Sequence, residues 1–337
     1  MSTATFCEID PAMPYLGDAL DPISATPHLA AVLSMHWRTT VRVKIDQAQL
    51  IRHKIGRRCL IAYDLQIAVG QSGWRSFGVI GKIRARGLDK ASYAAQQALW
   101  HGDFGPHAAD GILVPEPLGL IPSFHMWLQR RIPGEMMTHH LLGPSSSALV
   151  TWVAEAAAKL HDHPLPATRR YTIDDELHIL LDRLTQLSAR HPEWAARIAQ
   201  LAQRAANIAR SLPTPHQRSI HRDFYPDQLL VAGDRLYLVD LDLLAHGDPA
   251  LDIGNFIGHM IEYSLRHSGD PQALAASEAI LSQRYQQLVR PVGSREIDIY
   301  TTLTLARHIA LSDQFDDRRH CTEALLDLTE QRLAMAA

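Results

Sequence analysis

Residues 219–256 read SIHRDFYPDQLLVAGDRLYLVDLDLLAHGDPALDIGNF, and this stretch decides the fold that we expect. Two short apolar runs, 229–231 and 236–239, flank a turn that contains Gly233 and Asp234. Apolar runs of this length on either side of a Gly/Asp turn predict a β-hairpin. A hairpin brings the loop before its first strand close to the loop after its second strand. We therefore expect the polar residues of those two loops to form one site.

Three side chains in these loops have complementary chemistry. Asp223 and Gln228 precede the hairpin, and Asp240 follows it. A carboxylate can orient a hydroxyl group and accept its proton. An amide oxygen and a second carboxylate are hard ligands suited to Mg²⁺. Together they supply what phosphoryl transfer from ATP requires. Either aspartate alone would fit the polar end of an ordinary hairpin, but the order and spacing of all three favour a site.

The segments HRDFYPDQLL, LVDLD and GDPALDIGNF, which begin at His221, Leu238 and Gly247, resemble the aminoglycoside phosphotransferase family. The resemblance implies an α+β, bilobal protein-kinase-like fold, with a small antiparallel β-sheet N-lobe and a larger, mainly helical C-lobe. ATP and Mg²⁺ are the implied cofactors, bound between the lobes. The resemblance assigns Asp223 as the catalytic aspartate and Asp240 as the main Mg²⁺ ligand.

Gln228 occupies the position of the second metal ligand, where the family usually has Asn. Glutamine keeps the amide oxygen but adds a methylene, which changes the metal geometry. The resemblance also implies that Asp252 hydrogen-bonds the catalytic loop, that His221 stabilises this loop and that Arg222 pairs with an acid.

Composition limits the class of protein. The chain has 337 residues, of which 46% are hydrophobic and 20% charged, and this balance is typical of a globular protein of about two domains. A net charge of −3 gives no electrostatic reason to expect a nucleic-acid partner. No apolar run approaches the roughly 18 residues of a membrane helix. A monomer and a homodimer are both compatible with the sequence.

Three isolated cysteines, Cys7, Cys59 and Cys321, favour a reducing compartment over a disulfide scaffold or a cysteine zinc site. The N-terminus lacks the basic and apolar regions of a secretory signal. We therefore expect a cytoplasmic protein. We expect an irregular N-terminal arm over residues 1–30, an N-lobe over 31–130 and a C-lobe over 131–337.

In the N-lobe, residues 41–45 alternate as a strand, and residues 50–65 predict two strands around a turn at Gly56. The cations Lys54, Arg57 and Arg58 flank this turn. In the resembled fold the corresponding loop covers the nucleotide phosphates, where backbone N–H groups and cations favour an anion. This assigns Lys54, Gly56 and Arg58 to ATP. The alternative is a solvated hairpin tip with surface cations.

Lys82 is the one lysine in the apolar strand 78–83 and matches the family's lysine for the α- and β-phosphates. The alternative is a lysine on the wet face of an edge strand. The helix expected next, over residues 90–100, has no acid to pair with it. Gln96 or Gln97 could substitute as a neutral acceptor, although an amide attracts an ammonium less strongly.

A strand over residues 124–129 leads to the expected hinge, where the resemblance places adenine against the main chain of Gln129–Arg131. From there the pattern is mostly helical. His161 and His163 are expected to be loop contacts, because residues two apart do not share a helix face. The acids of residues 174–176 are expected to cap a helix, with contact to a cationic substrate as the alternative.

Only seven residues separate Asp240 from Asp248, which is too few for the activation segment of a protein kinase. We therefore predict a kinase that phosphorylates a hydroxyl of a sugar, an aminoglycoside-like compound or another alcohol. The rival hypothesis is a pseudokinase, supported by Gln228 and the missing helix acid. A metal hydrolase is disfavoured, because no histidine pair stands at ligand spacing beside an acid.

Overall fold

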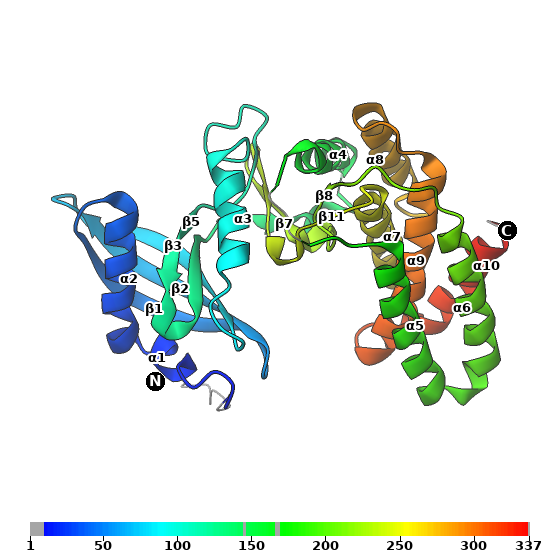
Figure 1. The fold of residues 1–337 in the computed structure, drawn as a ribbon, viewed down its shortest axis with the longest axis horizontal. Coiled ribbons are helices and arrows are strands. Elements are labelled where there is room, and N and C mark those ends of the chain that lie inside the picture. Colours follow the sequence, from blue (N-terminus) through cyan, green and yellow to red (C-terminus); the bar gives the residue numbers. More distant parts are fainter. Residues whose placement is uncertain (1–9, 144–145, 166–168, 336–337) are drawn as a thin grey trace. The chain divides into compact units, whose positions relative to one another are not determined.

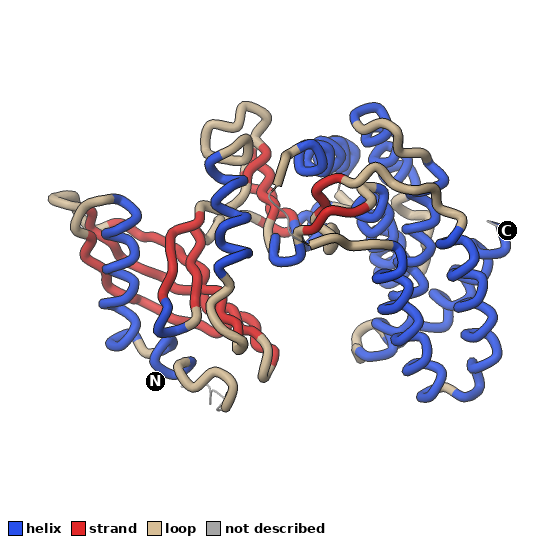
Figure 2. Tube along the Cα trace, viewed as in Figure 1, coloured by secondary structure: helices blue, strands red, loops and turns tan. Residues whose placement is uncertain are grey.

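The protein is described by a computed structural model that covers residues 10–143, 146–165 and 169–335. Cys7 and the first nine residues of the expected arm lie outside the described residues. The chain divides into two compact units. The first comprises the residues up to Gly134 together with Ala232–Tyr237, and the second comprises Glu135–Val231 and Leu238–Ala337. Figures 1 and 2 show the elements of each unit.

The first unit is built on an antiparallel five-stranded sheet (Figure 1). The strands follow the order β1 (Val41–Lys54), β2 (Arg58–Val69), β3 (Arg75–Arg84), β6 (Met126–Arg130) and β5 (Pro117–Ile121). Successive side chains of a strand point to opposite faces of the sheet. One face carries the buried apolar residues of this unit, including Ile61, Val79 and Leu128. The other face is therefore free to carry polar residues.

Two helices cover the apolar face, α1 (Leu16–Leu20) and α2 (Pro22–Trp37) (Figure 1). The expectation of an irregular lead-in is therefore wrong for its described part. Asp21 caps α2, because its Oδ2 accepts a hydrogen bond of 2.8 Å from Ser24 N, and Pro22 occupies the first helical position. Ala25, Leu29 and Leu33 recur every four residues and are buried against the sheet.

The first unit is completed by α3 (Lys90–His101) and by a parallel pair of short strands. β4 (Ile112–Leu113) pairs with β10 (Arg235–Leu238), with Leu236 opposite Ile112. This pairing is the reason that the first unit includes Ala232–Tyr237, a segment that is distant in sequence.

The second unit is mainly helical (Figure 2). Its α-helices are α4 (Ser146–Asp162), α5 (Ile173–Arg190), α6 (Ala195–Arg210), α7 (Ala250–Ser268), α8 (Ala275–Leu288), α9 (Ser294–Gln314) and α10 (Thr322–Met335). α7 and α9 pack closely because two residues of α7 are glycines. A Cβ on Gly254 would lie 2.4 Å from the Cβ of Tyr300, and one on Gly258 would lie 2.6 Å from Cγ2 of Thr304.

Four short strands in the second unit frame the expected catalytic loop. β8 (Arg218–Ile220) pairs antiparallel with β11 (Ala245–Gly247). β7 (Glu135–Met136) pairs antiparallel with β9 (Leu229–Ala232).

The 3₁₀ turns of the described residues are η1 (Pro122–Phe124), η2 (Met137–His140), η3 (Pro192–Trp194), η4 (Pro226–Gln228), η5 (Leu241–Leu243) and η6 (Arg319–Cys321). Among the described helices, none combines the length and apolar character needed to cross a membrane.

Candidate active site

A buried carboxylate, that of Asp252, holds the loop between β8 and β9. Asp252 lies in the first turn of α7 and is fully buried. Its Oδ2 accepts a hydrogen bond of 2.7 Å from His221 N, and its Oδ1 accepts one of 2.8 Å from Arg222 N. His161 Nε2 lies 2.9 Å from the same Oδ2. The role predicted for Asp252 is confirmed: it fixes the backbone immediately before Asp223.

His161 and Arg222 behave differently from the prediction. His161 is buried within α4 and bridges Asp252 to the hydroxyl of Tyr285 on α8, at 2.6 Å, so it is a core hydrogen-bonding residue and not a loop contact. The guanidinium of Arg222 lies 3.9 Å from the ring centroid of Tyr171. Within the described ranges no acid lies within salt-bridge distance of Arg222, so a cation–π contact replaces the expected acid partner.

The loop and the hairpin bring the three predicted residues of the second unit together. Gln228 Nε2 lies 3.5 Å from Asp223 Oδ2, which leaves the amide oxygen of Gln228 for another partner. Val239 N donates to Gln228 O at 2.9 Å, and His221 Nε2 lies 2.9 Å from Val239 O. Asp240 follows Val239 directly. Asp223 and Asp240 are half-buried, and Gln228 is buried.

The backbone is unusual on both sides of this set. Arg222 and Asp240 have φ angles of 71° and 56°, in the left-handed region that non-glycine residues seldom occupy. Each such residue costs on the order of 1 kcal/mol or more, and persists only where its surroundings fix it. Here the fixed neighbours are the backbone bonds of Asp252 to Arg222 and of Gln228 to Val239.

The residues can accommodate Mg²⁺. Asp240 offers a carboxylate, and Gln228 offers an amide oxygen that its bond to Asp223 does not use. Over the described part of the chain, no cluster of three or more His, Cys, Asp or Glu side chains is arranged to hold a metal. The candidate donor set is the carboxylate of Asp240 and the amide oxygen of Gln228.

A second layer behind Asp223 was not predicted from the sequence. Asn255 Nδ2 donates to Phe224 O at 2.9 Å, and Arg307 of α9 donates both to Asn255 Oδ1 and, at 2.7 Å, to Glu176 Oε1. Glu176 Oε2 accepts a hydrogen bond of 2.7 Å from Tyr171. These contacts join α5, α7 and α9 to the residue that follows Asp223.

Two histidines, of which His308 is buried and His259 half-buried, lie under the same loop. The ring of Tyr225 stacks on His259 with centroids 4.4 Å apart, and His259 Nε2 lies 3.3 Å from His308 Nε2. Burial holds the pKa of both imidazoles well below the usual value, so both are neutral. They support Tyr225 by packing and not by charge.

Two of the acids at the start of α5, Asp175 and Glu176, form hydrogen bonds within the protein. Asp175 forms a capping box with Thr172, and its Oδ2 accepts from Thr172 N at 2.8 Å. Glu176 accepts hydrogen bonds from Arg307 and Tyr171. The capping interpretation is confirmed for Asp175, and Glu176 is a buried ion-pair partner.

In the first unit, the pleat places the other predicted residues on one face. Lys82 of β3 stands opposite Leu60 on β2 and opposite Trp127 on β6. Residues two apart on a strand share a face, so Arg58 and Gln129 lie on the Lys82 face, away from the apolar core. Lys54 of β1 stands opposite Arg58, so it lies on the same face of the sheet. Lys82 is buried, and its Nζ lies 4.7 Å from the ring centroid of Trp127.

The turn between β1 and β2 already binds an anion. Gly56 has a φ of +67°, and its N–H donates to Asp10 Oδ2 at 2.8 Å. His53 Nε2 lies 3.0 Å from the same oxygen. These contacts, the bond from Gly56 first, hold the pKa of Asp10 below its usual value. The amide assigned to a nucleotide phosphate thus meets a carboxylate of the same unit.

The other residues of the first unit that were singled out from the sequence contact neighbouring protein groups. Gln96 Nε2 donates to Pro115 O at 2.7 Å and lies 3.2 Å from Gln129 Oε1, so Gln96 ties α3 to β6. Arg131 forms an ion pair with Asp64, and its N–H donates to Gly78 O at 3.0 Å. Adenine recognition by the main chain near Gln129 and Arg131 stays a prediction, without the Arg131 N–H as a donor.

The family described as "Phosphotransferase enzyme family" matches residues 89–288, which is more than half of the chain. The chain belongs to the phosphotransferase enzyme family. None of the curated proteins matches the sequence significantly.

Solved structures of phosphotransferases share the fold. One is a spectinomycin phosphotransferase, solved with ADP and spectinomycin, which is 11% identical, with 92% of this chain and 97% of that chain covered and a TM-score of 0.56. Another is a thermostable aminoglycoside phosphotransferase mutant, solved with ADP and hygromycin B (13% identical, 93% and 99% covered, TM-score 0.58). A choline/ethanolamine kinase family protein from Mesorhizobium loti is 16% identical (86% and 91% covered, TM-score 0.55).

At these identities the likeness establishes the fold alone. It confirms the predicted α+β architecture, with an antiparallel sheet in the N-terminal part and helices in the C-terminal part. The family match over residues 89–288 includes Asp223, Gln228 and Asp240. The family therefore makes this chain a phosphotransferase, and the acceptor and the donor remain to be derived from the site.

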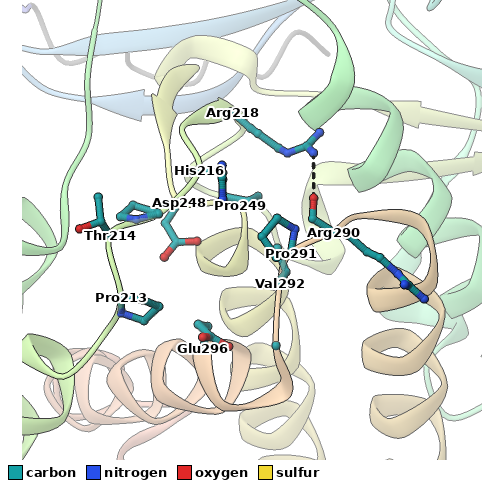
Figure 3. A pocket seen from close by; sticks show the side chains of 12 residues that line it. Pro213, Thr214, His216, Arg218, Asp248, Pro249, Arg290, Pro291, Val292 and Glu296 are labelled. Carbon is teal, nitrogen blue, oxygen red and sulfur yellow. Dashed lines mark hydrogen bonds between the residues drawn. The ribbon is translucent and has the colours of Figure 1, made fainter.

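A separate pocket of about 280 Å³ lies in the second unit (Figure 3). It is lined by Pro249, Arg290 and Pro291, with the carboxylates of Asp248 and Glu296. Arg218 closes one side by donating to Arg290 O at 3.3 Å. None of the residues predicted for the active site lines it, so it is a different feature of the molecule.

Proposed function

We propose that this phosphotransferase transfers the γ-phosphoryl group of ATP, bound with Mg²⁺, to a hydroxyl group of a small molecule. The observation that carries the proposal is the loop that Asp252 fixes, in which Asp223 lies beside Gln228 and the hairpin returns at Asp240. A fixed carboxylate beside two oxygen ligands suits a reaction that depends mainly on positioning and charge stabilisation.

Each predicted residue has a role in this proposal. Asp223 orients the acceptor hydroxyl and takes its proton as the oxygen attacks the γ-phosphorus. Asp240 and the amide oxygen of Gln228 hold Mg²⁺, which neutralises charge on the phosphates when it is bound. Lys82 pairs with the α- and β-phosphates.

The other residues of the first unit complete the nucleotide site in the proposal. Lys54 and Arg58 attract the phosphates as cations, and Gly56, whose N–H is bonded to Asp10, forms the turn between them. Their position on the Lys82 face of the sheet supports this role for Lys54 and Arg58. The main chain at Gln129 and Arg131 contacts adenine.

A small acceptor fits the segment after Asp240 better than a peptide does. Between Asp240 and Asp248 the chain forms only η5 and the short strand β11, which pairs with β8. A protein kinase needs its activation and peptide-docking segment there. The proposal therefore concerns an alcohol, a sugar or an aminoglycoside-like molecule.

The competing proposal is a pseudokinase that binds nucleotide without turnover. It is favoured by Gln228 in place of Asn and by Gln96, which bonds to Pro115 O where an acid would be expected. Lys82, Asp223 and Asp240, all retained, favour catalysis.

The test is ADP formation from ATP and Mg²⁺ across a panel of alcohols, sugars and aminoglycosides. We expect acceptor-dependent ADP formation in the wild type. Asp223→Asn should lower kcat by at least about 10²-fold, because it removes the general base, while Mg·ATP still raises the melting temperature. A wild type that is stabilised by Mg·ATP but inactive with every acceptor would favour the pseudokinase. Equal activity in Asp223→Asn would refute the role of that residue.

A further inference from the structure

The face of α5 that packs against other helices of the second unit carries charged residues within its apolar stripe. Glu176, Leu180, Arg183 and Leu187 recur at spacings of four, three and four residues, which places them on one side of the helix. Glu176, Leu180 and Leu187 are buried, and Arg183 is half-buried. Arg183 therefore lies two turns from Glu176 on the inward side of α5.

Hydrogen bonds connect this face to Asp223. Glu176 binds Arg307, Arg307 binds Asn255, and Asn255 binds the carbonyl of Phe224, the residue after Asp223. Arg183 is close enough to Asp223, Glu176 and Arg307 for the charges of all three to act on it. The guanidinium of Arg183 thus stands in the surroundings of the catalytic carboxylate.

Arg183 lacks the partner that its burial calls for. Among the residues that the structure describes, it makes no hydrogen bond and no ion pair within 4.0 Å. Burial and the charge of Arg307 lower the pKa of Arg183, and the charges of Glu176, Asp223 and Asp182 only partly compensate. Partial burial of an unpaired charge is unfavourable, so such a guanidinium is typical of a site that an anion completes.

The acids near the start of α5 already form hydrogen bonds within the protein. Both oxygens of Glu176 are hydrogen-bonded, one to Arg307 and the other to Tyr171. Asp175 serves the capping box of α5. A polycationic acceptor would meet Arg183 and would find neither of these carboxylates open.

We propose that Arg183 binds an anionic group of the acceptor, so that the substrate is an alcohol bearing a carboxylate or a phosphate and not a polyamine. This inference rests on the proposed function, because it assigns the acceptor of that same site. A guanidinium suits both groups, since its parallel N–H donors match their paired oxygens.

The first arm of the test measures kcat/KM with matched acceptors: hydroxy acids and sugar phosphates, the corresponding neutral alcohols and sugars, and amino sugars or aminoglycosides. The anionic members should be preferred over their neutral counterparts by about 10- to 100-fold, as expected for a charge-assisted hydrogen bond. Carboxylate and phosphate members within the panel show which anion is used. Preference for the cationic members would overturn the inference.

The second arm compares Arg183→Gln and Arg183→Lys with Arg204→Gln, a control at an exposed position of α6. Arg183→Gln should raise KM for the anionic acceptor by about 10- to 100-fold and leave KM for ATP unchanged, and Arg183→Lys should restore part of the loss. An increase in KM for ATP with no change for the acceptor would instead place Arg183 on the nucleotide phosphates. Because Arg183 has no partner to lose, its variants should melt at or above the wild-type temperature.

A binding measurement separates this inference from the proposed function. Calorimetry with the anionic alcohols, in the presence of Mg²⁺ and a non-hydrolysable ATP analogue, needs no turnover. Binding that Arg183→Gln abolishes would support the anion site even if the wild type were inactive, and the phosphotransferase proposal alone would then fail. Binding that persists equally in Arg183→Gln, or none by the wild type, would overturn the anion site.

Discussion

At the scale of single residues, the environment of a carboxyl group decides its role more than its identity does. Asp252 is fully buried, yet its oxygens accept two backbone N–H bonds and contact a histidine. Glu278 of α8 is half-buried, and its Oε1 has no hydrogen-bond partner among the described residues. Burial raises the pKa of Glu278 to about 7, with Arg332 opposing weakly. The two acids thus differ in their partners: Asp252 is fully hydrogen-bonded, and one oxygen of Glu278 is not.

Glu278→Gln should therefore stabilise the protein at alkaline pH. The folded state binds the proton of Glu278 more tightly than the unfolded state, whose pKa is 4.5. Stability is therefore lost as the pH rises from 4.5 toward 7. Removing this ionisation should add up to about 3 kcal/mol at pH 8 and about 1 kcal/mol or less at pH 5. Urea unfolding at both pH values checks this, with Glu323→Gln on an exposed face of α10 as control. An equal gain at both pH values would contradict it.

The positions of residues were predictable where sequence order determines them. Asp223, Gln228 and Asp240 are separated by a hairpin, and a hairpin can be recognised from two apolar runs and a Gly/Asp turn. Glu176 and Arg307 are 131 positions apart, so their ion pair depends on how α5 and α9 pack. The stacking of Arg222 on Tyr171 and the unpaired state of Arg183 depend on the same packing.

At the scale of elements, neighbouring helices hold the loop between β8 and β9 in addition to the loop's own contact between Gln228 and Asp223. Asp252 on α7 binds the loop backbone, Asn255 binds Phe224 O, and His161 on α4 orients Asp252. Two helices, α4 and α7, thus hold the residues on either side of Asp223. This arrangement explains how the left-handed conformation of Arg222 is maintained.

Asp252→Asn should loosen the loop. One amide oxygen would remain as an acceptor, but the amide N–H₂ would face a backbone N–H and leave it unbonded. We expect a loss on the order of 3 kcal/mol in the free energy of unfolding. Hydrogen exchange of the amides of His221 and Arg222 should accelerate, and Asp234→Asn at the exposed turn is the control. Unchanged exchange at His221 and Arg222 would contradict the anchoring role.

The N-terminal helices show where element prediction failed. Pro22 and Pro27 suggested an irregular segment, yet Pro22 occupies the first position of α2 and Pro27 lies within its first two turns. Proline is compatible with the first position of a helix because its missing N–H is not needed there, whereas Pro27 lies inside the helix and removes one backbone hydrogen bond. The cap at Asp21 and the stripe of Ala25, Leu29 and Leu33 were present in the sequence, and they outweigh the prolines.

At the scale of the whole molecule, the two units are not two continuous pieces of sequence. The segment Ala232–Tyr237 belongs to the first unit, because β10 pairs in parallel with β4. A composition shift from strands to helices could predict a boundary near residue 130. It could not predict this return of the chain, because parallel pairing of short strands leaves no local pattern.

We propose that the intact chain transfers a phosphoryl group from ATP to a hydroxyl group by means of Asp223. The most direct measurement is phosphorus NMR of a reaction of the full-length protein with ATP, Mg²⁺ and its best acceptor. We expect the signal of a new phosphate monoester, formed in an amount equal to that of ADP. We expect no such signal with Asp223→Asn. Inorganic phosphate in place of the monoester, or an undiminished monoester signal with Asp223→Asn, would contradict it.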